Sequence, residues 1–131
     1  MKTIYSVYTA ILLAVSLYSC SAYSSWSKTV SNQSSHTLIV FTTDGSGGFT
    51  FTDSLVLAPG AVEVIFEFDD ELNDANPECE QYISRLSLET DPGFSVTKEI
   101  ADGNNWTSSS NEASTGYEHM CTFTVTDDDI Q

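Results

Sequence analysis

Apolar and polar residues alternate along much of this chain, and this pattern is clearest at residues 62–68. The apolar members there are Val62, Val64, Phe66 and Phe68, with glutamates at two of the three positions between them. A period of two residues is typical of a β-strand with one buried face and one solvent face. The pattern predicts that these four side chains point into a core.

Turn signals rich in glycine, proline and aspartate separate the stretches that read as strands. We expect strands at residues 26–30, 36–43, 49–57, 62–68, 82–90, 94–100 and 117–125. The polar stretches 69–80 and 107–116 are expected to be loops, and loops on a rigid scaffold commonly carry binding residues. These elements predict an all-β, antiparallel β-sandwich of about seven to eight strands, immunoglobulin-like or transthyretin-like.

The N-terminus has a basic start at Lys2 and a short apolar run at residues 10–17, which is typical of a secretory signal peptide. A spanning helix needs about 20 consecutive apolar residues, so the run is expected to target the chain and not to cross the membrane. Leu17, Ser19 and Cys20 resemble the lipobox of bacterial lipoproteins, although Tyr18 is larger than the usual residue there. The resemblance implies cleavage before Cys20 and lipidation of its sulfur by a diacylglyceryl group with acyl chains such as palmitate. Cleavage after Ala22 by the ordinary signal peptidase is the alternative.

The predicted organisation follows from this cleavage site. Residues 1–19 form the signal peptide, residues 20–27 the lipidated cysteine and a flexible serine-rich tether, and residues 28–131 a single β-sandwich domain. Two or more acyl chains hold a protein firmly on a membrane. The expected location is the cell envelope, at the outer membrane because Ser21 stands where aspartate directs retention in enteric bacteria. The lipid anchor is then the only membrane contact, and either face of the membrane fits.

Four short segments occur in a recognisable order, at residues 32–35, 55–60, 105–106 and 122–129. In this order they resemble small lipoproteins of Bacteroidota. Those lipoproteins are largely uncharacterised, so the resemblance implies a location and an all-β fold and transfers no activity.

The chain is strongly acidic, with 19 acidic and four basic residues and a net charge of −15. Loss of the signal peptide leaves Lys28, Arg85 and Lys98 as the basic side chains. This balance disfavours nucleic acid as a partner, because its binding depends on clustered lysine and arginine. A cationic partner, a divalent metal and simple solubility each fit the charge.

Two cysteines, Cys79 and Cys121, remain beyond the lipobox. In an oxidising periplasm such a pair predicts a disulfide, with two free thiols as the alternative. No Cys-x-x-Cys spacing supports a redox role.

The acidic stretch 69–80 is a candidate calcium site. Asp69, Glu71, Asn73 and Glu80 occupy positions one, three, five and twelve of a calcium-loop frame. The glycine of the sixth position and the flanking helices of an EF-hand are missing. Calcium is therefore the one cofactor considered, held by loop oxygens, and a solvated acidic loop is the alternative.

Trp106 is a candidate ligand-binding residue because Asn104 and Asn105 precede it. A flat indole ring can stack on the C–H face of a sugar while the amides bond its hydroxyls. The alternative role for Trp106 is core packing.

No catalytic constellation emerges from the residues, so the chain is not expected to be an enzyme. His36 and His119 lie far apart in sequence, and there is no Gly-x-Ser-x-Gly motif. The expected function is a membrane-anchored, non-enzymatic module that binds a protein or a glycan. Two alternatives are an acidic accessory or immunity-type subunit that binds a cationic protein, and an adhesion module with calcium in a loop.

Overall fold

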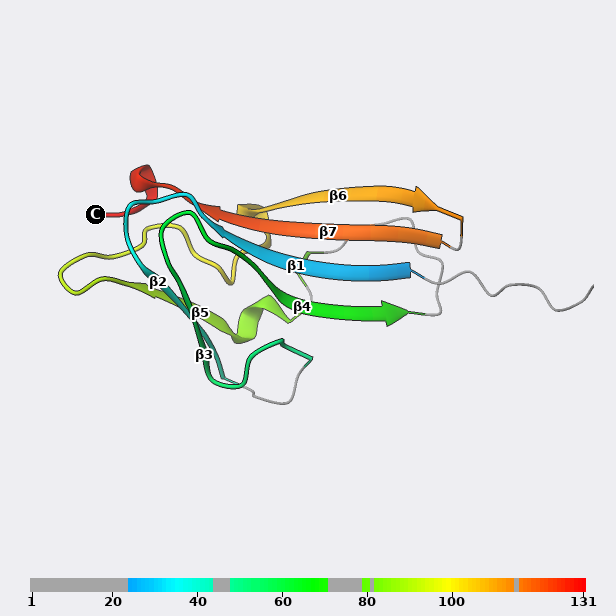
Figure 1. The fold of residues 1–131 in the computed structure, drawn as a ribbon, viewed down its shortest axis with the longest axis horizontal. Helices are drawn as coiled ribbons and strands as arrows, with labels where there is room; N and C mark the ends of the chain where they lie inside the picture. Colours follow the sequence, from blue (N-terminus) through cyan, green and yellow to red (C-terminus); the bar gives the residue numbers. More distant parts are fainter. Residues whose placement is uncertain (1–23, 44–47, 71–78, 81, 115) are drawn as a thin grey trace, which may run out of the picture.

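A computed structural model of the chain describes residues 24–43, 48–70, 79–80, 82–114 and 116–131 (Figure 1). The strands are β1 (Ser24–Asn32), β2 (Leu38–Thr42), β3 (Ser54–Leu57), β4 (Val62–Asp70), β5 (Leu86–Thr90), β6 (Trp106–Ala113) and β7 (Gly116–Val125). Three 3₁₀ turns complete the secondary structure of these residues: η1 (Ile83–Arg85), η2 (Gly103–Asn105) and η3 (Asp127–Asp129). The all-β class predicted from the alternation is confirmed.

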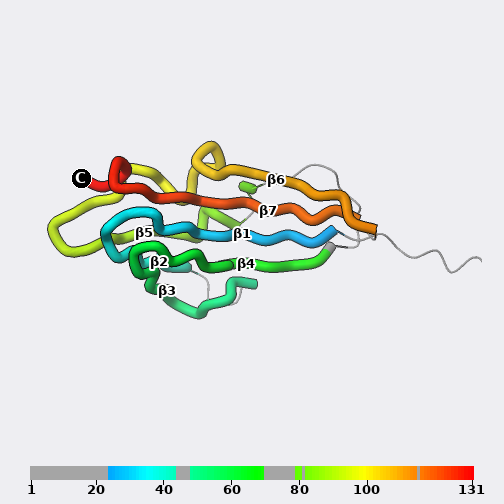
Figure 2. Tube along the Cα trace, turned by 45° about the horizontal axis from the view of Figure 1, so that its top comes forward, coloured from blue at the N-terminus to red at the C-terminus, as the bar shows by residue number. Residues whose placement is uncertain are grey.

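The strands form a four-stranded sheet in the order β4-β1-β7-β6 and a three-stranded sheet in the order β3-β2-β5. Figures 1 and 2 show the short sheet beside one end of the long sheet, whose other end extends beyond it. Both sheets contribute to one apolar core, which includes Val30, Leu38, Val40, Leu57, Ile65, Leu86, Phe123 and Val125. The two sheets therefore share one hydrophobic cluster, and one half of the long sheet projects past it.

The first and last strands pair in parallel at the centre of the long sheet. Their register runs from Ser25 opposite Glu118 to Asn32 opposite Val125. The other strand pairings are antiparallel, so the expected purely antiparallel arrangement fails at this one pair. Parallel strands need a long connection, and the intervening part of the domain supplies it here.

Strand β1 begins at Ser24, so residues 24–27 lie in the sheet and not in a flexible tether. Trp26, Lys28 and Val30 alternate on the buried face, whereas Ser25 and Ser27 are partly exposed on the other. The serine-rich composition of this stretch concealed a period-two pattern.

A β-bulge in β4 reverses the alternation that the sequence displays. Lys28 pairs with Phe66, but the next residue of β1 pairs with Val64, so Ile65 is an extra residue. Ile65 and Phe66 are both buried, whereas Val62 and Val64 are 61% and 39% exposed. A bulge places two residues opposite one and shifts the faces beyond it. The prediction that Val62 and Val64 point into the core is therefore wrong.

One predicted loop is a hairpin in the structure, and one predicted strand forms no ladder. The expected loop at 107–116 is instead the β6–β7 hairpin, whose ladder ends with Ala113 opposite Gly116. The expected strand at 94–100 forms no ladder with β5; its Val96 makes an isolated bridge to Ile130 near the C-terminus. Hydrogen bonds with the last residues of the chain hold this segment, and β5 remains a sheet edge in the described structure.

A disulfide joins Cys79 to Cys121 of β7, which confirms the predicted pairing. Cys121 is 1% exposed, so the bond anchors residue 79 against the core face of the long sheet. Among the described residues, no helix is long and apolar enough to cross a membrane.

Asn32 closes the end of β1 through its side-chain amide. Its Nδ2 donates to the carbonyl oxygens of His36 at 2.8 Å, Leu57 at 3.1 Å and Ala58 at 3.1 Å. Its Oδ1 accepts from the backbone N–H of Ser34 at 3.1 Å and from the Ser34 hydroxyl at 2.7 Å. One fully buried amide thus joins β1, the following turn and the end of β3.

Candidate functional site

A groove of about 390 Å³ lies at the projecting end of the long sheet, over β4, β1 and β7. It is lined by Ser25, Trp26, Ser27, Glu67, Phe68, Asp69, Glu118, His119 and Met120. Three strands that are distant in sequence therefore meet at this groove, which we call the outer groove.

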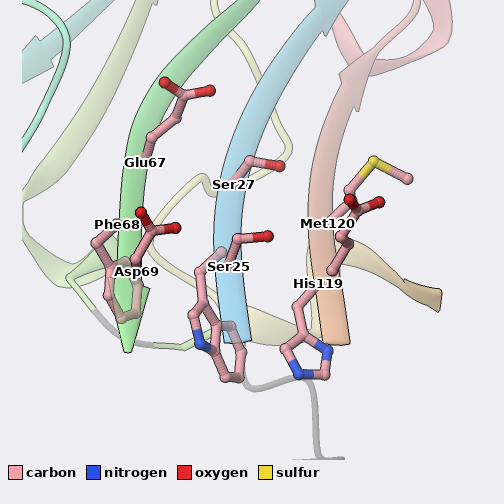
Figure 3. A pocket seen from close by; sticks show the side chains of 9 residues that line it. Ser25, Ser27, Glu67, Phe68, Asp69, His119 and Met120 are labelled. Carbon is pink, nitrogen blue, oxygen red and sulfur yellow. The ribbon is translucent and has the colours of Figure 1, made fainter. Parts of the chain in front are cut away.

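Strand register explains the shape of the outer groove. Ser25 lies between Asp69 on β4 and Glu118 on β7, and Ser27 lies between Glu67 and Met120. Residues two apart on a strand share a face, so all of these side chains lie on the outer face of the sheet. Figure 3 shows Ser25 and Ser27 on the middle strand, with Glu67 and Asp69 on one neighbour and Met120 on the other. The short serines form the floor and the longer side chains form the walls.

The outer groove combines negative charge with apolar contact area. The carboxylates of Glu67, Asp69 and Glu118 are exposed, and no lysine or arginine is among the residues that line the groove. Met120 is 43% exposed, and the bulge places exposed Val64 further along the same face. Within the described part of the chain, no three His, Cys, Asp or Glu side chains gather closely enough to hold a metal ion. The outer groove thus sets three exposed carboxylates beside an exposed apolar side chain.

Aromatic packing on the opposite face supports the groove floor. The Trp26 ring stacks with Phe68 at 5.8 Å between centroids and lies 4.2 Å from His119. The Ser110 hydroxyl and His119 Nδ1 are hydrogen-bonded at 2.7 Å. Trp26 is 9% and His119 is 1% exposed. These contacts fix the backbone of all three strands beneath the outer groove.

Lys28, two residues after Trp26 on the same face of β1, is a buried cation. It is 1% exposed, and its Nζ lies 5.5 Å from the centroid of the Phe66 ring. Burial alone lowers the pKa of its ammonium to about 8. The sequence reading counted Lys28 only toward net charge, although its place between Trp26 and Val30 marks it as an inward position.

Trp106 is a core residue and offers no open ring face to a sugar. It is 7% exposed, packs on Phe123 at 5.4 Å between centroids, and donates from Nε1 to the Ile100 carbonyl at 2.8 Å. The Asn104 side chain donates to Asp102 at 2.9 Å, and that of Asn105 donates to the Glu99 carbonyl at 2.8 Å. Both amides therefore organise the local η2 turn, and the structure supports the alternative role that the sequence left open.

The other predicted site residues are only partly described. Cys20, Glu71 and Asn73 lie outside the described residues. Asp69 is a wall of the outer groove, whereas Glu80 packs against Gly103, where an added Cβ would lie 2.6 Å from its Cγ. Asp69 and Glu80, the two proposed calcium ligands that the structure describes, therefore have different neighbours.

The two histidines belong to different clusters. His36 Nδ1 lies 3.3 Å from an oxygen of Asp91, and its ring contacts Phe94, whereas His119 packs under the outer groove. Neither cluster contains the other histidine.

Sequence reasoning missed the outer groove because it assigned its floor to a tether. The alternation of serine with Trp26, Lys28 and Val30 was the available signal. Comparison with known proteins adds no family: no protein-family model, curated protein or solved structure matches this chain.

Proposed function

We propose that this chain is a lipid-anchored envelope protein whose β-domain is a non-enzymatic binding module for a protein with a basic surface. The observation that supports this proposal most directly is the outer groove. It sets the carboxylates of Glu67, Asp69 and Glu118 beside the exposed apolar side chain of Met120, and exposed Val64 lies further along the same face. Protein interfaces typically combine apolar contacts with charges that complement the partner.

Charge favours a cationic protein over the other partners. With a net charge of −15, the chain repels acidic proteins and nucleic acids and attracts basic surfaces at long range. Burial of Trp106 removes the ring on which glycan stacking depended. The function proposed is therefore that of an acidic accessory subunit that binds a cationic protein. Its attachment to the membrane is through Cys20.

Crosslinking in the native membrane tests the site. A photoreactive residue at Met120 is compared with one at Val56, which is 62% exposed on the other sheet. We expect a single basic protein to be captured from position 120 and not from position 56. Equal capture from both positions would contradict the proposal, as would capture of polysaccharide alone.

A matched pair of charge variants separates the groove from the net charge. Glu67→Gln with Glu118→Gln and Glu63→Gln with Glu112→Gln each remove two exposed carboxylates. The groove pair should weaken binding to the captured partner about tenfold or more, and the control pair should change it less than about threefold. Equal effects would mean that overall charge, and not the groove, drives binding.

The anchor has its own test. Cys20→Ala should abolish incorporation of a labelled fatty acid and release the protein from the membrane fraction. Unchanged labelling in this variant would overturn the lipid attachment while leaving the groove proposal intact.

A further inference from the structure

A second groove runs along the open edge of the short sheet, between β5 and residues 94–101. It consists of two adjoining cavities of about 280 and 230 Å³ that share Leu88 and Val96 in their linings. Their linings cover all five residues of β5 on one wall and all of 94–101 on the other. We call it the edge groove, and it lies where the sequence predicted a β5 partner strand.

The backbone of β5 presents unpaired groups to the edge groove. The Thr43 N–H donates to the Arg85 carbonyl at 3.0 Å, one step beyond the β2–β5 ladder. Bonded and non-bonded pairs alternate in an antiparallel ladder, so Ser87 and Glu89 bond to β2. The N–H and C=O groups of Leu86, Leu88 and Thr90 therefore point away from β2, and of these the Leu86 N–H already donates to the Ile83 carbonyl.

The pairing on the far side of β2 agrees with this assignment. The Thr42 N–H donates to the Asp53 carbonyl at 3.1 Å, toward β3 and away from β5. Thr42 lies opposite Leu86 in the β2–β5 register, so this pair is a non-bonded one. In the described structure, no backbone hydrogen bond joins β5 to residues 94–101.

The opposite wall of the edge groove, formed by residues 94–101, also directs backbone groups into the groove. Ser95 exchanges hydrogen bonds of 2.7 and 2.9 Å with Gln131, and the Thr97 N–H donates to the Asp129 carbonyl at 2.8 Å. Both residues thus face the C-terminus, and the intervening Val96 directs its N–H and C=O toward β5. Two strand-like edges with free backbone groups face each other across the edge groove.

We infer that the edge groove receives an added β-strand from a basic partner protein, paired with β5 and with Val96. Strand addition to an exposed sheet edge gives affinity through backbone hydrogen bonds and specificity through alternate side chains. This surface belongs to the short sheet, so the inference is independent of the outer groove.

The side chains of the edge groove define the sequence of the strand. Leu88 and Val96 are half-buried and form an apolar floor, so every second residue of the strand should be apolar. The carboxylates of Glu89, Asp91 and Glu99 line the rim, so the alternate residues should be lysine or arginine. Lys98 also lines this groove, but its ammonium donates to the Thr124 carbonyl at 2.7 Å.

A second copy of this chain is a poor source of the strand. It has four basic residues in 131 and no stretch in which basic and apolar residues alternate. The net charge of −15 also opposes close approach of two copies. The occupant is therefore a different protein, with a lysine- or arginine-rich extended segment.

Amide hydrogen exchange with a defined peptide tests the inference. The probe is a nine-residue peptide that alternates valine and lysine, added to the full domain and followed by NMR. We expect exchange at Leu88, Thr90 and Val96 to slow at least about tenfold, as new backbone bonds form. Ser87 and Glu89, already bonded to β2, should change little.

Peptide and protein controls separate strand pairing from charge attraction. A peptide with a central proline should lose the protection, because proline cannot donate to a ladder. The exposed double variant Glu89→Lys with Glu99→Lys should bind the lysine peptide at least about tenfold more weakly and prefer a peptide with glutamate in place of lysine.

Three results would overturn the inference. One is unchanged exchange at the three amides while the peptide binds. Another is protection of β6 or β3 amides instead. The third is protection of the same amides in concentrated protein without peptide, which would make a second copy the occupant.

Discussion

Lys28 and Phe66 face each other across the β1–β4 pair, with the Lys28 Nζ 5.5 Å from the centroid of the ring. A cation over an aromatic face gains on the order of 0.5 to 2 kcal/mol, which offsets only part of the desolvation of a buried ammonium. Burial accordingly lowers the pKa of Lys28 to about 8. The core of the long sheet therefore contains a destabilising charge at neutral pH.

Lys28→Met should stabilise the domain. The thioether side chain has a similar length and no charge to bury, so we expect the free energy of unfolding to rise by about 1 to 2 kcal/mol at pH 7. Urea unfolding measures the change. Lys98→Met, which removes a partly exposed lysine bonded to a carbonyl, is the control and should not stabilise. A loss of stability in Lys28→Met would show that the ammonium has a stabilising role.

The stability of the wild-type domain should rise between pH 8 and 10. The pKa of Lys28 is about 8 in the folded state and near 10.5 when unperturbed, so the unfolded state binds more protons in this window. Stability increases with pH where the unfolded state binds more protons. The advantage of Lys28→Met over the wild type should therefore shrink across the same window. A constant difference between the two proteins would contradict the lowered pKa.

Removal of the Cys79–Cys121 disulfide should lower stability by about 2 to 4 kcal/mol. The bond closes a loop with a sequence separation of 42, and the chain-entropy model assigns about 4 kcal/mol to such a loop. Cys79→Ala with Cys121→Ala is compared with the wild type in urea, with and without reductant. Reductant should lower the wild-type midpoint to that of the double variant and leave the variant unchanged.

The bulge predicts opposite responses at adjacent positions of β4. Val64→Thr should change stability by less than about 0.5 kcal/mol, because Val64 lies on the outer face. Ile65→Thr should reduce it by about 2 to 4 kcal/mol, because a hydroxyl replaces apolar volume at a fully buried site. Thermal and urea unfolding give both values. Equal losses would favour the unbroken alternation over the bulge.

Asn32→Asp should destabilise the domain by about 2 to 4 kcal/mol at pH 7, because a carboxylate oxygen would face three carbonyl oxygens. The pKa of the new carboxyl should be raised in the folded state, which then binds more protons than the unfolded state. The variant should therefore regain stability as the pH falls from 7 toward 4.5. Gln33→Glu, the same exchange at an exposed neighbour, should show neither effect.

Local pattern was sufficient to locate β2, β5 and β7. These strands lie within or beside their predicted ranges. In β5 and β7, buried residues such as Leu86 and Phe123 alternate with polar ones, whereas β2 is recognisable as a short apolar run around the buried Val40. The disulfide was predictable because only two cysteines remain beyond the lipobox. These features depend on neighbours in sequence or on composition.

Other features depend on the partner strand and were not predictable. Strand β6 has mostly exposed residues, such as Ser108 and Ser110, and its pairing with β7 holds it without an apolar stripe. The bulge at Ile65 exists only relative to the register of β1. The outer groove, in turn, requires the parallel neighbour of Ser25, which lies almost the whole domain away in sequence.

The parallel pairing of β1 with β7 also constrains how the domain forms. The central pair of the long sheet joins the first described strand to the last. Among the strand pairs of the described structure, it therefore has the largest entropic cost of loop closure. Folds dominated by such non-local pairs fold in about milliseconds to seconds. Because the chain is synthesised from its N-terminus onward, this sheet cannot be completed until β7 has been made. The domain should thus fold as one unit, and only after nearly all of it has been synthesised.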